Sequence, residues 1–132
     1  MTTKPEPIAI VGAGGIFPDA LTLDRYWENL AARRCAAKEV PAGRWPLDPR
    51  EAFDPARGAP DKVYSLKACF IEGFRFDPAG LALDPAWAGG LDCAFHLALH
   101  AARSAVDDAE LAPAVRGRTG VIIGQLVLPS DS

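Results

Sequence analysis

The sequence predicts an α/β fold, because short apolar runs alternate with segments of helical periodicity. Residues 8–11 (IAIV) form a run without polar alternation that ends at Gly12, and residues 119–124 (TGVIIG) form a second one. Such runs are typical of strands that are buried on both faces of a sheet. These strands need neighbouring strands and covering helices, which 132 residues with few helical segments do not supply. We therefore interpret the chain, residues 1–132, as the incomplete leading part of a larger α/β domain.

The first helix is predicted over residues 23–33. Its apolar side chains recur at helical spacing, and they are Leu23, Tyr26, Trp27 and Leu30. Thr22 is the expected N-cap, because its hydroxyl can accept a backbone N–H of the first turn. Arg33 and Arg34 suit the C-terminal end, where the helix dipole favours positive charge.

The strongest helix is predicted over residues 93–109, with Asp92 as its cap. Its apolar face is widened by alanines, and small residues there allow a neighbouring element to approach closely; the face consists of Ala94, Phe95, Ala98, Leu99, Ala101, Ala102, Ala105 and Val106. His96, His100, Arg103 and Asp107 form the opposite stripe. The helix is expected to end near Glu110, before Pro113, and a polar turn leads into the second strand.

Residues 40–62 are predicted to form a long irregular excursion, since Pro, Gly, Asp and Arg dominate them. Loops of this length in compact domains are usually functional or disordered. Trp45 and Phe53 are expected to pin the excursion to the body of the protein. Residues 63–71 fit a short hairpin or edge strand, and residues 74–87 predict turns, because each Asp-Pro pair disfavours helix at the Asp.

Composition indicates an ordinary soluble protein. With 49% apolar residues and a net charge of -3, the chain lacks the basic excess that nucleic acid or anionic lipid would favour. Its apolar runs stop well short of the roughly 20 residues that span a bilayer, and the N-terminus MTTKPEP has no apolar signal core. We expect a cytoplasmic location. The odd number and wide spacing of Cys35, Cys69 and Cys93 predict buried, inert thiols.

Two local patterns resemble ligand-binding motifs, and each also has a purely structural interpretation. Gly12 and Gly14 begin a dinucleotide fingerprint, but Phe17 stands where its third glycine belongs, so the glycines are expected only to let the chain turn sharply. His96 and His100 have the spacing of a zinc pair, but the sequence shows no third ligand. We expect ordinary hydrogen bonds from these histidines and no metal. The Asp107-Asp108 pair is expected to be a solvated helix end.

The order of the segments resembles the N-terminal part of a β-ketoacyl synthase (ketosynthase) domain. The segments are IAIVGAGGIFPDA at 8–20, YWENL at 26–30, VPAGRW at 40–45, FRFDPAGL at 74–81, LDCAFHLALHAARSAVDDAEL at 91–111 and TGVIIG at 119–124. Residues 60–74 and 95–102 look most like ketosynthases of large type I synthases of the polyunsaturated-fatty-acid, glycolipid and polyketide kind.

This resemblance implies a partial thiolase-like fold, layered αβαβα in the complete and usually dimeric domain. The implied reaction is the decarboxylative Claisen condensation of an acyl-transferring 3-oxoacyl-carrier-protein synthase in polyketide or fatty-acid synthesis. A phosphopantetheine thiol on a partner acyl carrier protein would deliver the acyl group to an active-site Cys, with two His residues assisting.

The family's catalytic residues have no counterpart in these 132 residues. Its Cys stands in an Ala-Cys-Ser context and its His residues in His-Gly-Thr and Gly-His contexts, and none of these occurs here. The resemblance therefore implies no catalytic residue, no directly bound cofactor and no activity for the chain alone. Leu126 and Val127 are expected to line the acyl pocket of a complete domain. The expected partners are an acyl carrier protein, the remainder of the synthase and a second copy.

Two alternatives stay open at the level of sequence. The chain is a non-catalytic module whose 40–62 excursion docks a carrier or synthase partner, or it is a small nucleotide-binding α/β protein. Carrier binding by a cooperatively folding monomer would favour the first, and NAD or FAD binding would favour the second.

Overall fold

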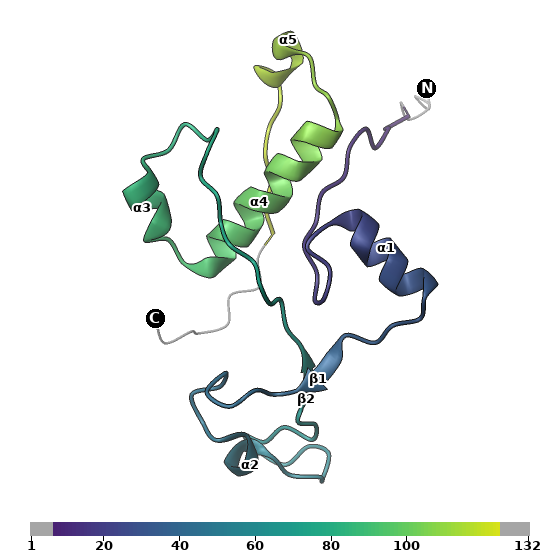
Figure 1. The fold of residues 1–132 in the computed structure, drawn as a ribbon, viewed down its shortest axis with the longest axis vertical. Coiled ribbons are helices and arrows are strands. Elements are labelled where there is room, and N and C mark those ends of the chain that lie inside the picture. Colours follow the sequence, from purple (N-terminus) through teal and green to yellow (C-terminus); the bar gives the residue numbers. More distant parts are fainter. Residues whose placement is uncertain (1–6, 125–132) are drawn as a thin grey trace, which may run out of the picture. The chain divides into compact units, whose positions relative to one another are not determined.

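The computed structural model describes residues 7–124, which form two compact units (Figure 1). Unit 1 contains the described residues up to Ile16 and those from Arg75 onward, and unit 2 is Phe17–Phe74. Unit 2 holds α1 (Leu23–Ala31), β1 (Ala37–Glu39), α2 (Pro49–Ala52) and β2 (Lys67–Cys69). Unit 1 holds α3 (Pro85–Gly89), α4 (Cys93–Asp108) and α5 (Pro113–Arg116).

Helix α1 begins where the sequence predicts. The Thr22 hydroxyl accepts the Arg25 N–H at 3.2 Å, which confirms Thr22 as the N-cap. The helix ends two residues before its predicted end, because Arg33 adopts a left-handed φ of 53°. The Arg33 N–H then donates to the Leu30 carbonyl at 3.0 Å and the Arg34 N–H to the Asn29 carbonyl at 2.8 Å. This is the Schellman arrangement, which usually places glycine at the left-handed position.

Replacing Arg33 with glycine is expected to raise the free energy of unfolding of the intact domain by about 0.5–1 kcal/mol, because glycine adopts this φ without steric cost. Arg34→Gly is the matched control, since Arg34 is not in the left-handed region. That variant should be neutral or destabilising. Chemical denaturation of both variants measures the difference, and stabilisation by Arg34→Gly alone would contradict the interpretation.

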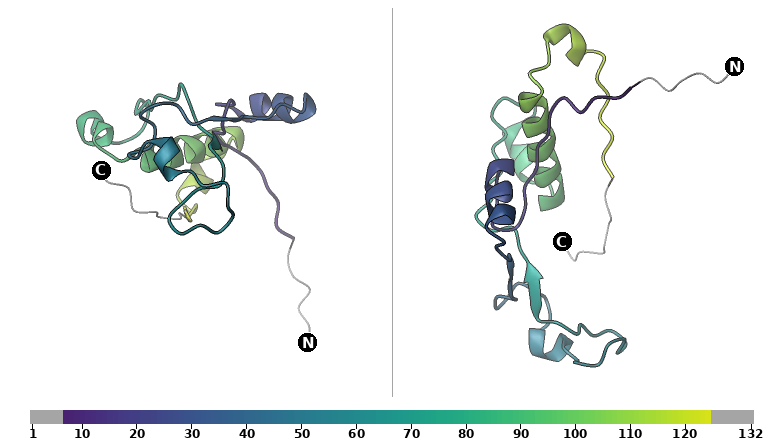
Figure 2. Two further views of the ribbon diagram at one scale, coloured as in Figure 1. Left: turned by 90° about the horizontal axis from the view of Figure 1, so that it is seen from below. Right: turned by 90° about the vertical axis from the view of Figure 1, so that its right-hand side faces the viewer.

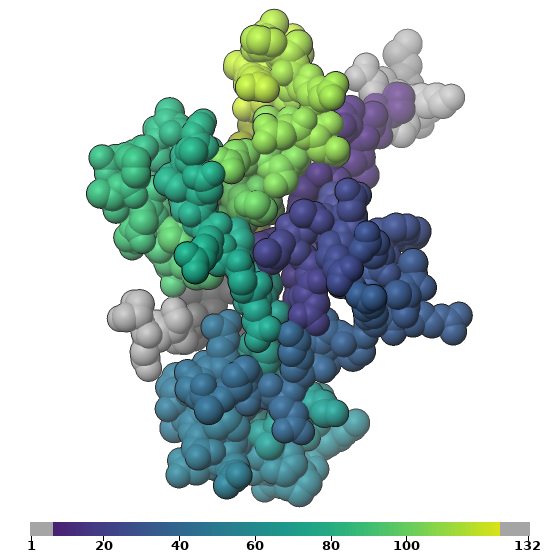
Figure 3. Space-filling view, in the orientation of Figure 1, coloured from purple at the N-terminus to yellow at the C-terminus, as the bar shows by residue number. Residues whose placement is uncertain are grey.

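Unit 2 contains a two-stranded antiparallel ribbon that joins distant segments. β1 pairs with β2 in the register Ala37↔Cys69, Lys38↔Ala68 and Glu39↔Lys67. The sequence predicts a strand or hairpin within 63–71, and β2 confirms the strand, but its partner β1 precedes the excursion and was not predicted. Within the excursion, the Asp54 N–H donates to the Val63 carbonyl at 3.0 Å and the Val63 N–H to the Ala52 carbonyl at 2.9 Å. The excursion is drawn in blue in Figure 3.

The predicted strong helix of unit 1 is present. Helix α4 ends at Asp108, one residue before its predicted end, and the Asp92 carboxylate accepts the Ala94 N–H at 2.8 Å. Helices α3 and α5 replace two predicted turns. In α3, Asp84 accepts the Trp87 N–H at 2.7 Å, and Pro85 occupies the first turn. An Asp-Pro pair disfavours helix at the Asp but favours helix start immediately after it, since Asp caps and proline fits the first position.

The two predicted strands at 8–11 and 119–124 do not form. Neither segment has a neighbouring strand among residues 7–124, where β1 and β2 pair only with each other. A strand is defined by hydrogen bonds to a neighbour, so apolar sequence alone does not produce one. Their large apolar side chains face solvent, with Ile8 97%, Ile10 93% and Ile122 99% exposed.

Little apolar surface is buried. Among the described residues, the buried hydrophobic ones are Ala20, Phe70 and Ala88. The described part of the chain contains no helix of the length and apolar character that a membrane span requires.

Candidate functional site

The glycines after residue 11 are packed against α4. A Cβ on Gly12 would lie 2.5 Å from the Ala105 carbonyl oxygen, and one on Gly14 would overlap the Ala101 carbonyl oxygen and the Ala105 nitrogen. Figure 2 shows the N-terminal segment running alongside this helix. The glycines with left-handed φ in the described chain are Gly43, Gly58, Gly73 and Gly80, so neither Gly12 nor Gly14 serves a sharp turn of that kind.

Close packing therefore explains Gly12 and Gly14, and it corrects the predicted role of a sharp turn. It also argues against a phosphate cradle, because the C-terminal half of α4 occupies the space beside the glycine backbone, whereas a phosphate is bound by a helix N-terminus.

Asp108 links the same segment to the end of α4. The Ala13 N–H donates to the Asp108 Oδ2 at 2.8 Å. The predicted solvated helix end is confirmed, since Asp107 and Asp108 are both exposed at the end of α4, and Asp108 in addition accepts this backbone N–H. Its partner lies 95 residues earlier in the chain, a separation over which local sequence patterns give no signal.

His96 is a structural residue of unit 1. Its Nε2 lies 2.7 Å from the Ala88 carbonyl oxygen, and because a carbonyl only accepts, this nitrogen donates. The imidazole stacks on Phe76 with ring centroids 4.4 Å apart. Within residues 7–124, no group of three His, Cys, Asp or Glu side chains gathers in a way that could hold a metal ion.

All three cysteines are exposed, which contradicts the predicted buried thiols. Cys69 lies on the exposed face of strand β2, on the same side as Lys67, and Cys93 is the first residue of α4. Cys35 lies in the segment between α1 and β1. Cysteine usually prefers the protein interior, but few of the described residues are buried, so there is little core in which these thiols could lie.

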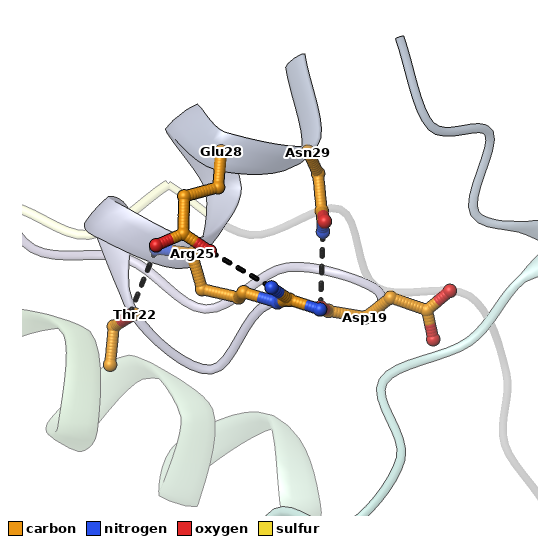
Figure 4. A network of polar contacts seen from close by, with 5 residues as sticks. All are labelled: Asp19, Thr22, Arg25, Glu28 and Asn29. Atoms are coloured by element: carbon orange, nitrogen blue, oxygen red, sulfur yellow. Dashed lines mark hydrogen bonds and ion pairs between the residues drawn. The ribbon is translucent and has the colours of Figure 1, made fainter. Parts of the chain in front are cut away.

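A polar cluster that the sequence did not predict lies in unit 2. Lys38 Nζ lies 2.7 Å from Asp19 Oδ1 and 2.8 Å from Glu72 Oε2. The Asp19 backbone has a left-handed φ of 56°, and its carbonyl accepts the Asn29 side-chain N–H at 3.1 Å. Figure 4 shows Asn29 reaching down from α1 to Asp19, beside the Arg25–Glu28 ion pair. The cluster thus joins the turn before α1 to strand β1 and to the segment that follows β2.

Lys38 is held as a cation by these contacts. Hydrogen bonds to Asp19 and then to Glu72 raise the pKa of its ammonium above the ordinary value of about 10.4. A raised pKa gives stability that is fully present below the ordinary value and is lost only as the pH rises through the higher folded-state value. The contribution of Lys38 is therefore constant across the neutral range.

Lys38→Met is expected to lower the thermal stability of the intact domain slightly, because Asp19 and Glu72 lose their shared cation. The pairs are partly exposed, so the difference from the unsubstituted protein should shrink as salt is added. Lys67→Met, on the exposed face of the ribbon, is the control. Thermal unfolding at low and high salt checks this, and an effect independent of salt would show that the ion pairs are not its cause.

Several pockets open on unit 2, and the two that lie beside α1 and in the excursion lack the chemistry of a catalytic site. One, of about 450 Å³, lies beside α1 and is lined by Asp19, Arg25, Asn29, Arg34, Cys35 and Ala36. The other, of about 530 Å³, lies in the excursion and includes Trp45 and Leu47. Cys35 is the thiol of the first pocket, but the histidine base that would activate such a nucleophile is not among its lining residues. Leu126 and Val127, the predicted acyl-pocket residues, lie outside the described residues.

Comparison with known proteins identifies the family. The family model described as "Beta-ketoacyl synthase, N-terminal domain" matches residues 5–127. The chain belongs to the β-ketoacyl synthase family.

The ketosynthase relatives are large synthases. The chain is 38% identical over 122 residues to polyketide synthase ThaG of Burkholderia thailandensis, a match that covers 90% of the chain and 2% of ThaG. It is 36% identical to polyketide synthase PksN of Bacillus subtilis, covering 92% of the chain and 2% of PksN. The chain therefore spans a small fraction of the length of the curated relatives it matches.

Solved ketosynthases share the fold. The oxazolomycin ketosynthase domain OzmH KS7 of Streptomyces albus matches with a TM-score of 0.64 and 29% identity, over 83% of the chain and 19% of that structure. The PfaC ketosynthase–chain length factor matches with a TM-score of 0.66 and 28% identity, over 76% of the chain and 11% of that structure. These matches confirm the predicted partial thiolase-like α/β fold and the resemblance to a ketosynthase fragment.

Proposed function

We propose that the chain forms the first part of a ketosynthase domain that performs decarboxylative Claisen condensation of acyl and malonyl thioesters during polyketide synthesis. The observation that carries the proposal is the family match over residues 5–127, in a chain that spans 19% of a solved ketosynthase structure. A cytoplasmic location fits this role.

The uncovered apolar surface supports the proposal. Residues 8–11 and 121–123 present Ile and Val side chains to solvent, and Phe95 of α4 is also exposed. Helix α4 has a wide apolar face, yet none of its residues is buried. Such a face normally packs against other apolar surface. The remaining part of a ketosynthase domain would cover these surfaces and pair the backbone of the two unformed strands.

In the proposed domain the described residues have a structural role and do not take part in the reaction. Gly12, Gly14 and Asp108 fix the first core segment against α4, and the Lys38 cluster fixes α1 to the ribbon. The nucleophilic Cys and the two His residues of the family would come from sequence beyond these 132 residues. A thiolate nucleophile needs a lowered pKa, and the His donors stabilise the developing enolate and oxyanion.

The partner of the reaction would be an acyl carrier protein that bears phosphopantetheine. Neither of the two pockets described above pairs a nucleophile with a histidine base, so their residues do not fit the reacting end of that arm, and we assign it no site in them. Leu126 and Val127 would line the acyl pocket in the complete domain, which would act as a homodimer together with the remainder of the synthase.

The proposal predicts that the chain's own thiols are dispensable. In the intact ketosynthase, simultaneous Cys35→Ser, Cys69→Ser and Cys93→Ser substitutions should leave condensation within about twofold, since exposed substitutions usually cost less than 0.5 kcal/mol. Substitution of the downstream Cys in the Ala-Cys-Ser context is the matched control and should abolish condensation. Product formation from acyl and malonyl carrier proteins measures both.

Loss of condensation in the triple variant, with folding unchanged, would contradict this assignment of the nucleophile. Decarboxylation of malonyl carrier protein by residues 1–132 alone would overturn it as well.

A further inference from the structure

Helix α1 has an apolar stripe that the rest of unit 2 covers only in part. Leu23, Trp27 and Leu30 lie on one side of the helix, because they are spaced three and four residues apart. Trp27 is 70% exposed and Leu30 is 51% exposed. We call these three residues the α1 stripe.

The α1 stripe is not the side by which the helix packs within unit 2. Tyr26 stacks on Phe17 with ring centroids 4.0 Å apart, and Asn29, only 8% exposed, bonds to Asp19. At 100° per residue, the direction of Tyr26 and Asn29 differs from the centre of the α1 stripe by about 100°. The helix therefore packs within unit 2 through the side that carries Tyr26 and Asn29, and its apolar stripe faces away from these contacts.

The remaining side of α1 is polar and needs no cover. Arg25 and Glu28 form an exposed ion pair at 2.8 Å, and Asp24 is exposed beside them. Water is the natural environment of these groups, whereas a Trp and two Leu residues side by side on a helix mark a surface that another apolar surface covers.

We infer that the α1 stripe is an interface with the part of the ketosynthase domain that lies outside residues 1–132. This inference rests on the proposed function, because that function supplies the missing partner. The chain spans 19% of the OzmH KS7 structure, so in a domain of that size most of the apolar surface available to cover α1 lies outside residues 1–132. The partner surface is an apolar one, of aliphatic and aromatic side chains, that receives the Trp27 ring.

Photocrosslinking from position 27 tests the inference in the intact ketosynthase. p-Benzoylphenylalanine in place of Trp27 keeps a large aromatic group there, and mass spectrometry identifies the peptides it captures. We expect crosslinks to peptides encoded after residue 132. The same group at Glu28, one residue away and 63% exposed in its side chain, is the control and should give few intramolecular crosslinks.

Three results would overturn the inference: crosslinks from position 27 only to residues 1–132, crosslinks only to a second copy of the protein, or a yield no higher than that from position 28. Condensation by the unsubstituted protein is measured separately. An active ketosynthase without the expected crosslinks would refute the α1 interface and leave the proposed function standing. Trp27→Phe should keep soluble, active protein and Trp27→Glu should lose it, whereas equal behaviour of the two would also count against the interface.

Discussion

An isolated polypeptide of residues 1–132 is expected to show no cooperative thermal transition and to associate in solution. Native domains are stable by only about 5–15 kcal/mol. Among residues 7–124 the buried hydrophobic residues are Ala20, Phe70 and Ala88, and the burial of so few side chains cannot balance the conformational entropy of ordering the chain.

Differential scanning calorimetry and analytical ultracentrifugation measure this directly. We expect a flat heat-capacity trace, binding of a hydrophobic dye and concentration-dependent association through the unpaired backbone of residues 8–11 and 121–123. A monomer that unfolds cooperatively would contradict the proposal that the chain is one part of a larger ketosynthase domain.

Ile10→Asp is expected to affect the isolated polypeptide and the intact ketosynthase differently, which tests the same prediction. Ile10 is 93% exposed in the chain, so the substitution should leave the isolated polypeptide unchanged or more soluble. In the intact ketosynthase the same carboxylate would be buried in a core strand without a partner, and we expect loss of folded protein. Glu28→Gln, on the polar side of α1, should be silent in both contexts.

The sequence predicted best where structure is local. Thr22 and Asp92 cap the two main helices as expected, because a cap depends on the few residues that follow it. The helix starts at Pro85 and Pro113 were missed, since the Asp-Pro and Ala-Pro pairs were interpreted as turns and not as the first helical positions.

Features that depend on distant residues were missed or mispredicted. The Lys38 cluster joins residues 19, 38 and 72, and the Asp108 carboxylate meets the Ala13 N–H from 95 residues away. The strands at 8–11 and 119–124 were predicted from apolar pattern, but a strand needs a neighbour, and the described residues supply none. The family resemblance was confirmed because the order of several segments carries information that no single segment does.

Gly14→Val is expected to destabilise the intact ketosynthase by about 3 kcal/mol or more, the largest effect of any single substitution in this segment. The first Cβ atom would already overlap the backbone of Ala101 and Ala105 in α4. Overpacking against a side chain can be relieved by a change of rotamer, whereas the helix backbone can yield only by moving as a whole. The 8–11 segment would therefore separate from α4, and the Ala13–Asp108 hydrogen bond would be lost with it.

Gly117→Ala is the control for this prediction, because a Cβ at Gly117 would meet nothing within 4 Å and its φ of -67° suits any residue. That substitution should change the free energy of unfolding by less than about 0.5 kcal/mol. Chemical denaturation of the intact domain gives both values. If Gly14→Val were as stable as Gly117→Ala, the close approach of the glycine backbone to α4 would not exist in the folded protein. The role of these glycines would then be to form a turn or to bind a ligand. If Gly14→Ala already caused most of the loss, the steric origin would be established, since alanine adds only the one atom that the helix backbone excludes.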